Sequence, residues 1–425
     1  MKANTFVMTF LKLCILVLAG ILLATALMIG VYLLPTGRVK DHVTESAELI
    51  EFEGDYPTLT SMASSCLDNY TDALMLQKAA FEGKNIGLIE KAMMVYNADN
   101  GPFSFTLDQV WQEPEGADGC NSYSRYWHGY LCFLKPLLWF FNYRELRMVN
   151  LYLQVALVAI ICVLLKNKGY NKYILAFLML ILMQSPVTTS MSLQNSTIYY
   201  IYLVSSLVLL SCYQKLRSSG LLIYLFIIIG GTTSFLDFLT YPLVSFGVPF
   251  IFCLIQETEN RKLLRFFVLM LAAWGMGYAG IWAGKWIVGS LLTGENIISN
   301  AMGAVHDRTS GSFQNVNVGL WLIVRNNAVE LIKNPVAVLV SIATVLLIAV
   351  KVLKGEAKKV FTGKSGIFLL SALLPLGWYM VLRNHSYVHS PLFTWRELLI
   401  SGFAMTCWLA YIVDWNKIAV KLARK

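Results

Sequence analysis

The chain has 425 residues, of which 57 % are hydrophobic and only 14 % are charged, whereas soluble domains contain about 25 % charged residues. This composition excludes an ordinary soluble globular protein and predicts an integral membrane protein. The net charge of +9 does not indicate nucleic-acid binding, because the basic residues gather in short connections between apolar runs, as in cytoplasmic loops of membrane proteins.

The apolar runs predict an all-α fold, a polytopic integral membrane helical bundle in which residues 1–425 form one domain. Stretches of the ~17–25 residues needed to span a bilayer recur along the sequence. The first run is too long for the apolar core of a secretory signal, typically ~7–15 residues, and is expected to be an uncleaved anchor. About ten transmembrane helices are predicted, at 8–34, 147–165, 173–190, 197–214, 219–236, 239–256, 265–288, 335–353, 365–382 and 397–415.

Charge sets the expected orientation. Lys2 and Lys12 favour a cytoplasmic N-terminus, and alternate crossings then place each basic turn and the C-terminus in the cytoplasm of a multi-pass plasma-membrane protein. Histidine titrates near neutrality and often serves in acid–base, phosphate or metal sites. All five histidines fall on the opposite side, which is therefore the expected working face: His42, His128, His306, His385 and His389.

The largest extracytoplasmic loop, residues 35–147, is a predicted subdomain between the first two membrane helices and holds sixteen of the twenty-five acidic residues. Apolar periodicity near 74–80 and 86–93 predicts short helices on the membrane surface or on the bundle. The stretch 127–141 is apolar and aromatic but too short to span, which predicts an interfacial or re-entrant helix ending near Asn142.

Two further extracytoplasmic loops are predicted, at 291–333 and 383–396. The first contains a Gly/Asn/Ser-rich piece and then apolar residues at helical spacing from Trp321 to Ile332, which predicts a surface helix. Cys66 and Cys120 also lie on this side, and both a disulfide between them and free thiols stay open, because connectivity cannot be read from sequence.

Three carboxylates of the large loop are candidate catalytic residues. Asp68 and Asp72 share a face if their segment is helical, and their repulsion would favour binding of a proton or of a divalent cation such as Mg²⁺ or Mn²⁺. The alternative is that one of them is the N-cap of the following helix. Asp41 lies at the expected level of the lipid headgroups, where a lipid-linked phosphate would be, or else starts an acidic, solvated helix.

Asp237 stands between two uncharged stretches of nineteen residues, at the expected tip of a helical hairpin. An ionisable group in such surroundings is costly and indicates a functional site. The alternative is a cap of the helical turn.

Arginines on the predicted extracytoplasmic side indicate an anionic ligand, because the guanidinium group binds phosphate through paired charge-assisted hydrogen bonds. Ordinary pairing with the loop carboxylates is the alternative. A zinc site at residues 383–396 is disfavoured, because only two histidines and no cysteine lie there. The predicted substrate-binding residues are Arg125, His128, Asp237, Arg308, Arg383, His385, His389 and Arg396.

This layout resembles the GT-C class of polyprenyl-phosphate-sugar glycosyltransferases, and more narrowly the polytopic proteins of bacterial surface-polysaccharide clusters. The likeness covers the whole chain in layout, and locally it rests on residues 68–72, 124–128, 235–237 and 385–396. The resemblance implies an inverting transfer in which Asp68 or Asp72 deprotonates the acceptor hydroxyl while basic residues hold the departing lipid phosphate. The chain lacks a Trp-Trp-Asp motif and an Asp-x-Asp motif, so acceptor and metal dependence stay open.

The expected function is therefore transfer of a sugar from a polyprenyl-phosphate carrier to a cell-envelope glycan or lipid acceptor on the extracytoplasmic face. The expected partners are this donor, the acceptor and membrane lipids, with no nucleic acid. A transporter or flippase, or a polymerase of lipid-linked glycans, is the alternative. Transporters usually bind substrate near the bilayer midplane and show repeated halves, whereas this sequence gathers its charges at one face.

Overall fold

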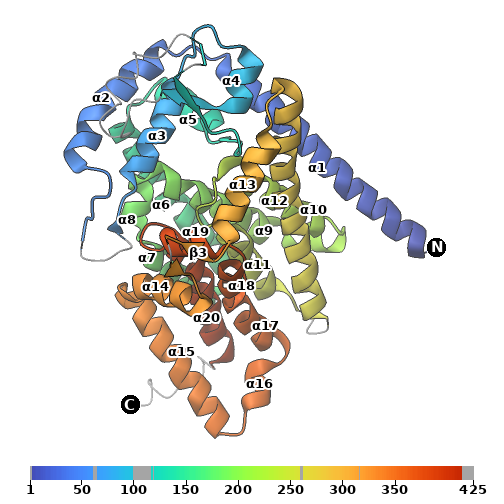
Figure 1. The fold of residues 1–425 in the computed structure, drawn as a ribbon. Helices are drawn as coiled ribbons and strands as arrows, with labels where there is room; N and C mark the ends of the chain where they lie inside the picture. The colour runs from blue at the N-terminus through green and yellow to red at the C-terminus, as the bar shows by residue number, and fades with distance from the viewer. Residues whose placement is uncertain are drawn as a thin grey trace.

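The computed structural model describes residues 2–60, 65–98, 116–117, 119–258, 262–314 and 316–413, which are mostly helical (Figure 1). Two short antiparallel hairpins pair β1 (Tyr96–Ala98) with β2 (Cys120–Ser122) and β3 (Ser312–Phe313) with β4 (Val316–Asn317). The α-helices are α1 (Lys2–Tyr32), α2 (Gly37–Glu53), α3 (Asn69–Ala80), α4 (Leu88–Met94), α5 (Leu131–Leu138), α6 (Tyr143–Asn167), α7 (Ile174–Gln184), α8 (Pro186–Met191), α9 (Leu193–Ser218), α10 (Leu222–Leu236), α11 (Val244–Gln256), α12 (Leu263–Thr293), α13 (Ile297–Thr309), α14 (Leu320–Ile332), α15 (Pro335–Leu353), α16 (Ala357–Phe361), α17 (Gly363–Ala372), α18 (Leu374–Val381), α19 (Arg383–Val388) and α20 (Leu399–Ile412), with 3₁₀ turns η3 (Asn171–Tyr173) and η4 (Thr394–Leu398).

Six helical segments of the described residues are long and apolar enough to cross a membrane, namely most of α1, then α6, α9, α12, α15 and the joined α17–α18. Three further apolar segments are shorter: Asn171–Gln184, α10 and α11. The helical, polytopic class predicted from the sequence agrees with this architecture. The predicted number of ten membrane helices is not confirmed.

Several predicted helices are shorter than expected or interrupted. The helix predicted at 173–190 ends at Ser185, which has a φ of 61° and precedes Pro186, so that α7 and α8 are separate. The helix predicted at 239–256 begins only at Val244. In the last predicted span, 397–415, η4 leads into the largely buried α20, which ends at Ile412.

The predicted loop 35–147 forms one group of elements, α2 to α5 with the first hairpin, gathered at one end of the bundle (Figure 1, top). Helices α3 and α4 occupy the stretches whose apolar spacing predicted short helices. The helix predicted at 127–141 is shorter, because residues 123–130 form a loop and α5 ends at Leu138. Asn142 instead caps α6: its side chain accepts the Glu145 N–H at 3.0 Å.

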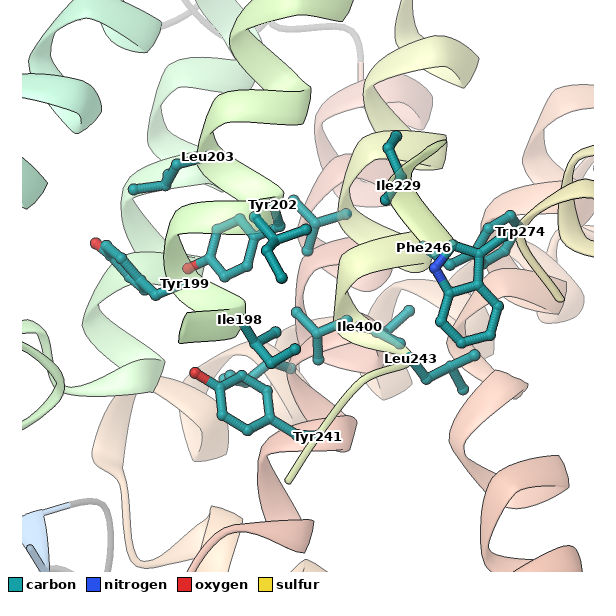
Figure 2. Packing of buried hydrophobic residues seen from close by; sticks show 14 of the residues in the cluster. Ile198, Tyr199, Tyr202, Leu203, Ile229, Tyr241, Leu243, Phe246, Trp274 and Ile400 are labelled. Atoms are coloured by element: carbon teal, nitrogen blue, oxygen red, sulfur yellow. The ribbon is translucent and has the colours of Figure 1, made fainter. Parts of the chain in front are cut away.

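Helices α10 and α12 pack backbone against backbone. A Cβ atom added at Gly230 would lie 2.0 Å from the carbonyl oxygen of Trp274, and one added at Gly277 would lie 2.0 Å from that of Ile227. Only glycine permits this approach, as in other close pairs of membrane helices. Around this contact, Figure 2 shows Trp274 beside Phe246, and the Trp274 indole donates to Ser245 Oγ at 3.0 Å.

All eight cysteines are free, so Cys66 and Cys120 are not bridged. In the predicted loop 291–333, α13 and α14 flank the β3–β4 hairpin. The third loop, 383–396, folds as α19 followed by the start of η4, and Asn384 joins it to the preceding loop by donating to the Asp307 carbonyl at 2.6 Å and to the Ser312 carbonyl at 2.8 Å. Residues 383–396 are thus held against α13.

Candidate functional site

Asp72 joins the α2–α5 group to the bundle. Its side chain is 0 % exposed and accepts hydrogen bonds from the Tyr143 hydroxyl at 2.6 Å, from the Leu193 N–H at 2.8 Å and from the Gln194 N–H at 3.0 Å. The two N–H groups are at the start of α9, where a carboxylate is favourable. Burial raises the pKa of Asp72, while these hydrogen bonds oppose the shift. Asp72 is therefore placed as an anchor for α9.

A second set of contacts extends this anchor. Arg147 forms a paired ion contact with Glu53 at 2.7 and 2.8 Å and also donates to Asn69 Oδ1 at 3.1 Å and to the Tyr143 hydroxyl at 3.0 Å. Glu53 ends α2 and Asn69 starts α3, so one guanidinium group from α6 fixes two helices of the α2–α5 group. Nothing in the sequence singles out Arg147 for this role, because Glu53 and Asn69 are 94 and 78 residues away along the chain.

Asp68 is the N-cap of α3, as the alternative interpretation of the sequence predicted. Its two carboxylate oxygens accept from the Thr71 N–H at 3.0 Å and the Thr71 hydroxyl at 2.8 Å. Burial raises the pKa of Asp68 to about 6, and the positive charge of Arg396 is among the opposing effects. Asp41, the third predicted catalytic residue, is exposed on α2.

Asp237 caps its own turn, which is the alternative stated for it. It ends α10, and its Oδ2 accepts the N–H groups of Leu239 at 2.8 Å and Thr240 at 2.9 Å. Leu239 has a φ of 76°, a conformation that is strained for any residue except glycine. His385 Nε2 bonds to the Leu239 carbonyl at 2.7 Å. Asp237 therefore holds the N–H of Leu239 and His385 holds its carbonyl, so that both backbone polar groups of Leu239 are fixed.

His128 belongs to a buried aromatic group that supports this turn. Its Nε2 donates to the Tyr123 carbonyl at 3.0 Å, and its ring stacks on Phe238 at 6.2 Å between centroids. Burial, followed by the nearby charge of Lys78, keeps the pKa of His128 well below its ordinary value. His128 is therefore a neutral structural residue here, and it touches the segment that carries Asp237.

The described residues enclose a cavity of about 260 Å³ between α12, α13, α18 and the Leu239 turn. Aromatic rings make up much of its wall, and two arginines, Arg125 and Arg308, border it. The guanidinium carbons of both arginines lie 5.7 Å from the centre of the same ring, that of Tyr126. The lining residues are Arg125, Tyr126, Leu239, Tyr278, Ala279, Trp282, Trp286, Ala301, Ala304, Val305, Arg308, Thr309, Trp378, Val381 and Leu382.

Polar atoms at this cavity are left without protein partners. Among the described residues, Arg125 Nε, the Tyr126 hydroxyl and Trp378 Nε1 are buried with no hydrogen-bond partner, and Arg308 donates one long bond of 3.5 Å, to the Ala304 carbonyl. In the described part of the chain, no ion pair includes Arg125 or Arg308. Buried polar groups are normally satisfied, so the two arginines beside this almost wholly apolar cavity are its candidate contacts for an anionic group.

His385 and His389 lie near the Arg308 charge. Burial lowers the pKa of His389 to about 4, and Arg308 adds to this effect; burial and His389 lower that of His385. The two imidazoles, with ring centres 4.7 Å apart, are therefore neutral at pH 7 and do not supply positive charge. They were predicted to bind phosphate, and the structure instead places His385 behind the cavity wall.

The other predicted substrate-binding and catalytic residues do not line this cavity. Arg383 is exposed, and Arg396 is fully buried in η4. Neither they nor Asp41, Asp68 and Asp72 belong to the described lining of the cavity. Among the residues that the structure describes, no group of three acidic, histidine or cysteine side chains is placed to hold a metal ion.

Several lining residues were missed from the sequence. Tyr278, Trp282 and Trp286 recur every fourth residue and so share one face of α12. This spacing was visible in the sequence, but the same pattern is usual for residues buried in a helical core. Comparison with family models, with curated proteins and with solved structures finds no match for this chain. The GT-C resemblance therefore stays a prediction.

Proposed function

We propose that this protein is a membrane glycosyltransferase of the GT-C type, which transfers a sugar from a polyprenyl-phosphate carrier to a cell-envelope glycan or lipid. The observation that carries the proposal is the aromatic cavity bordered by Arg125 and Arg308, two cations without an acidic partner in the described residues. Sugar rings stack on aromatic faces, and arginine binds phosphate. A phosphate-linked sugar matches both properties.

The position of the cavity also supports a lipid-linked donor. Trp378 and Val381 lie at the end of the candidate span Gly363–Val381, and Trp282 lies in the second half of the candidate span α12. Val381 is 61 % exposed and apolar, which offers a surface for a hydrocarbon tail beside the cavity. In the proposed topology the α2–α5 group is extracytoplasmic and both termini are in the cytoplasm, so the cavity opens at the outer leaflet.

In the proposed reaction the bond between the sugar C1 and the phosphate oxygen breaks, and the acceptor oxygen bonds to C1 as its hydroxyl loses a proton. Arg125 and Arg308 would stabilise the negative charge that develops on the leaving phosphate. Of the two aspartates predicted as the base, Asp68 is the better candidate, because in the described residues it accepts from Thr71 of its own turn, whereas Asp72 anchors the start of α9 and Tyr143. Asp68 caps α3 and does not line the cavity, so the reaction would need the acceptor hydroxyl to lie between Asp68 and the sugar.

The test is a transfer assay with purified protein and a panel of labelled polyprenyl-phosphate sugars. Release of the lipid phosphate is expected with at least one donor. Arg308→Gln should lower kcat/KM for that donor roughly tenfold to a hundredfold, the range for a lost charge-assisted hydrogen bond. Arg383→Gln, at an exposed arginine away from the cavity, is the matched control and should transfer normally. Equal activity of the two variants, or no release with any donor, would reject the proposal.

A further inference from the structure

Arg396 is a fully buried guanidinium group whose hydrogen-bonding capacity is mostly unused. It lies in η4 and is 0 % exposed. Its Nη1 donates to the Leu392 carbonyl, whereas Nε and Nη2 have no partner in the part of the chain that the structure describes. The N–H groups of Nε and Nη2 point the same way along one edge of the planar group. That edge can hold a carboxylate or a phosphate through two parallel hydrogen bonds.

No acidic side chain of the described residues forms an ion pair with Arg396. Asp68 and Cys66 are near enough to feel its charge: burial raises the pKa of the Cys66 thiol, and Arg396 opposes that shift. The oxygens of Asp68, however, accept from Thr71. A buried charge without a counter-charge is strongly unfavourable, so a bound anion would stabilise this arrangement.

The surroundings of Arg396 contain further unused polar atoms. Its guanidinium carbon lies 4.7 Å from the ring centre of Trp395 and 6.0 Å from that of Tyr241, whose hydroxyl donates to the Asn195 carbonyl. Trp395 Nε1, Asn195 Oδ1 and the carboxylate oxygen Oε2 of Glu397 are all buried without a partner. Arg396 is thus one of several buried polar groups of η4 and its surroundings that lack a partner in the described residues.

We propose that the Nε–Nη2 edge of Arg396 binds a phosphate or carboxylate group carried by the acceptor substrate, at a site separate from the donor cavity of Arg125 and Arg308. The term acceptor rests on the proposed function, whereas the anion site itself does not. Two separate anion sites imply that both substrates are anionic. Asp68 is close enough to Arg396 to be affected by its charge. An acceptor bound at Arg396 would therefore be held near the candidate base.

The test measures how inorganic phosphate stabilises the purified protein in nanodiscs of phosphatidylcholine. Arg308→Met serves as the background, so that the donor cavity binds phosphate more weakly, and Arg396→Met is added to it. Without phosphate, the added change should leave the melting temperature equal or higher, because it removes an unpaired buried charge. With phosphate, it should weaken the apparent affinity roughly tenfold to a hundredfold, while Arg383→Met added to the same background should not.

Arg396→Lys is the second variant, because it keeps the positive charge but lacks the pair of parallel N–H donors. It should fold normally and bind phosphate more weakly than the arginine does. A parallel arm replaces inorganic phosphate with phosphatidic acid in the nanodisc. A response to that lipid alone assigns the site to a lipid-linked phosphate, and a response to inorganic phosphate assigns it to the phosphate group itself. Phosphate responses that Arg396→Met and Arg396→Lys leave unchanged in both arms overturn the proposal. Absence of sugar transfer would reject the proposed function and leave a phosphate response at Arg396 intact.

Discussion

Replacement of Asp72 by asparagine distinguishes a structural anchor from a catalytic base. In the native structure, one oxygen of Asp72 accepts from Tyr143 and the Leu193 N–H, and the other accepts from the Gln194 N–H. An asparagine presents an NH₂ group in place of one of these oxygens. Whichever way the amide is turned, a backbone N–H at the start of α9 then faces a donor. We therefore expect Asp72→Asn to destabilise the fold.

The magnitude follows from two losses. A buried N–H left without an acceptor costs about 1–3 kcal/mol, and loss of a negative charge at a partly buried helix start costs up to about 2 kcal/mol. The sum is about 1–5 kcal/mol. Asp68→Asn is the matched control, because asparagine is as good an N-cap as aspartate and can still accept the Thr71 N–H, so its stability should be equal or slightly higher at pH 7.

The assay is thermal unfolding of both variants in the same detergent, followed by the transfer assay on the folded fraction. We expect a clear fall in melting temperature for Asp72→Asn alone, and loss of transfer without loss of stability for Asp68→Asn. If Asp72→Asn melts like the native protein but has no activity, the structural role assigned to Asp72 is refuted and it becomes the candidate base.

Three further predictions concern packing, pH and topology. Gly230→Ala should force α10 and α12 apart and cost about 1–3 kcal/mol or more, measured as a lower melting temperature, whereas Gly275→Ala, with nothing within 4 Å of the added atom, should not. Burial raises the pKa of Asp68 to about 6 from its ordinary 3.8, so the stability that its protonation contributes is fully present below pH 3.8 and is lost as the pH rises through 6. The melting temperature should therefore fall less between pH 4 and pH 7 for Asp68→Asn than for the native protein. Parallel curves for the two proteins would contradict this. A membrane-impermeant thiol reagent should label Asp41→Cys in intact cells but Lys168→Cys only after permeabilisation; the reverse pattern would overturn the proposed orientation.

The class of fold was predictable because it depends on composition and on the lengths of apolar runs, which are local properties. The apolar stretches at 8–34, 147–165, 197–214 and 335–353 each coincide with a candidate membrane-spanning helix. The exact boundaries were less predictable. The break at Ser185 and the late start of α11 at Val244 depend on backbone conformations that are stabilised by neighbouring elements.

The candidate site was predictable only in part. Arg125 and Arg308 were selected from the sequence by residue type, and both border the cavity. The sequence could not show that Asp72 would contact the start of α9, because Leu193, the first residue of α9, is 121 residues from Asp72 along the chain. A carboxylate has the same local signature whether it accepts hydrogen bonds from a distant helix or from a substrate.

Hydropathy and charge act residue by residue, so they suffice to identify a helical membrane protein whose candidate polar residues lie in three predicted loops and at Asp237. Which of those residues are satisfied and which are free depends on the folded structure. Asp72 and His128 have partners, whereas Arg125 and Arg396 keep unpartnered buried nitrogens. The physical reason is that the cost of a buried polar group depends on the partners that folding brings to it, and these come from distant parts of the chain.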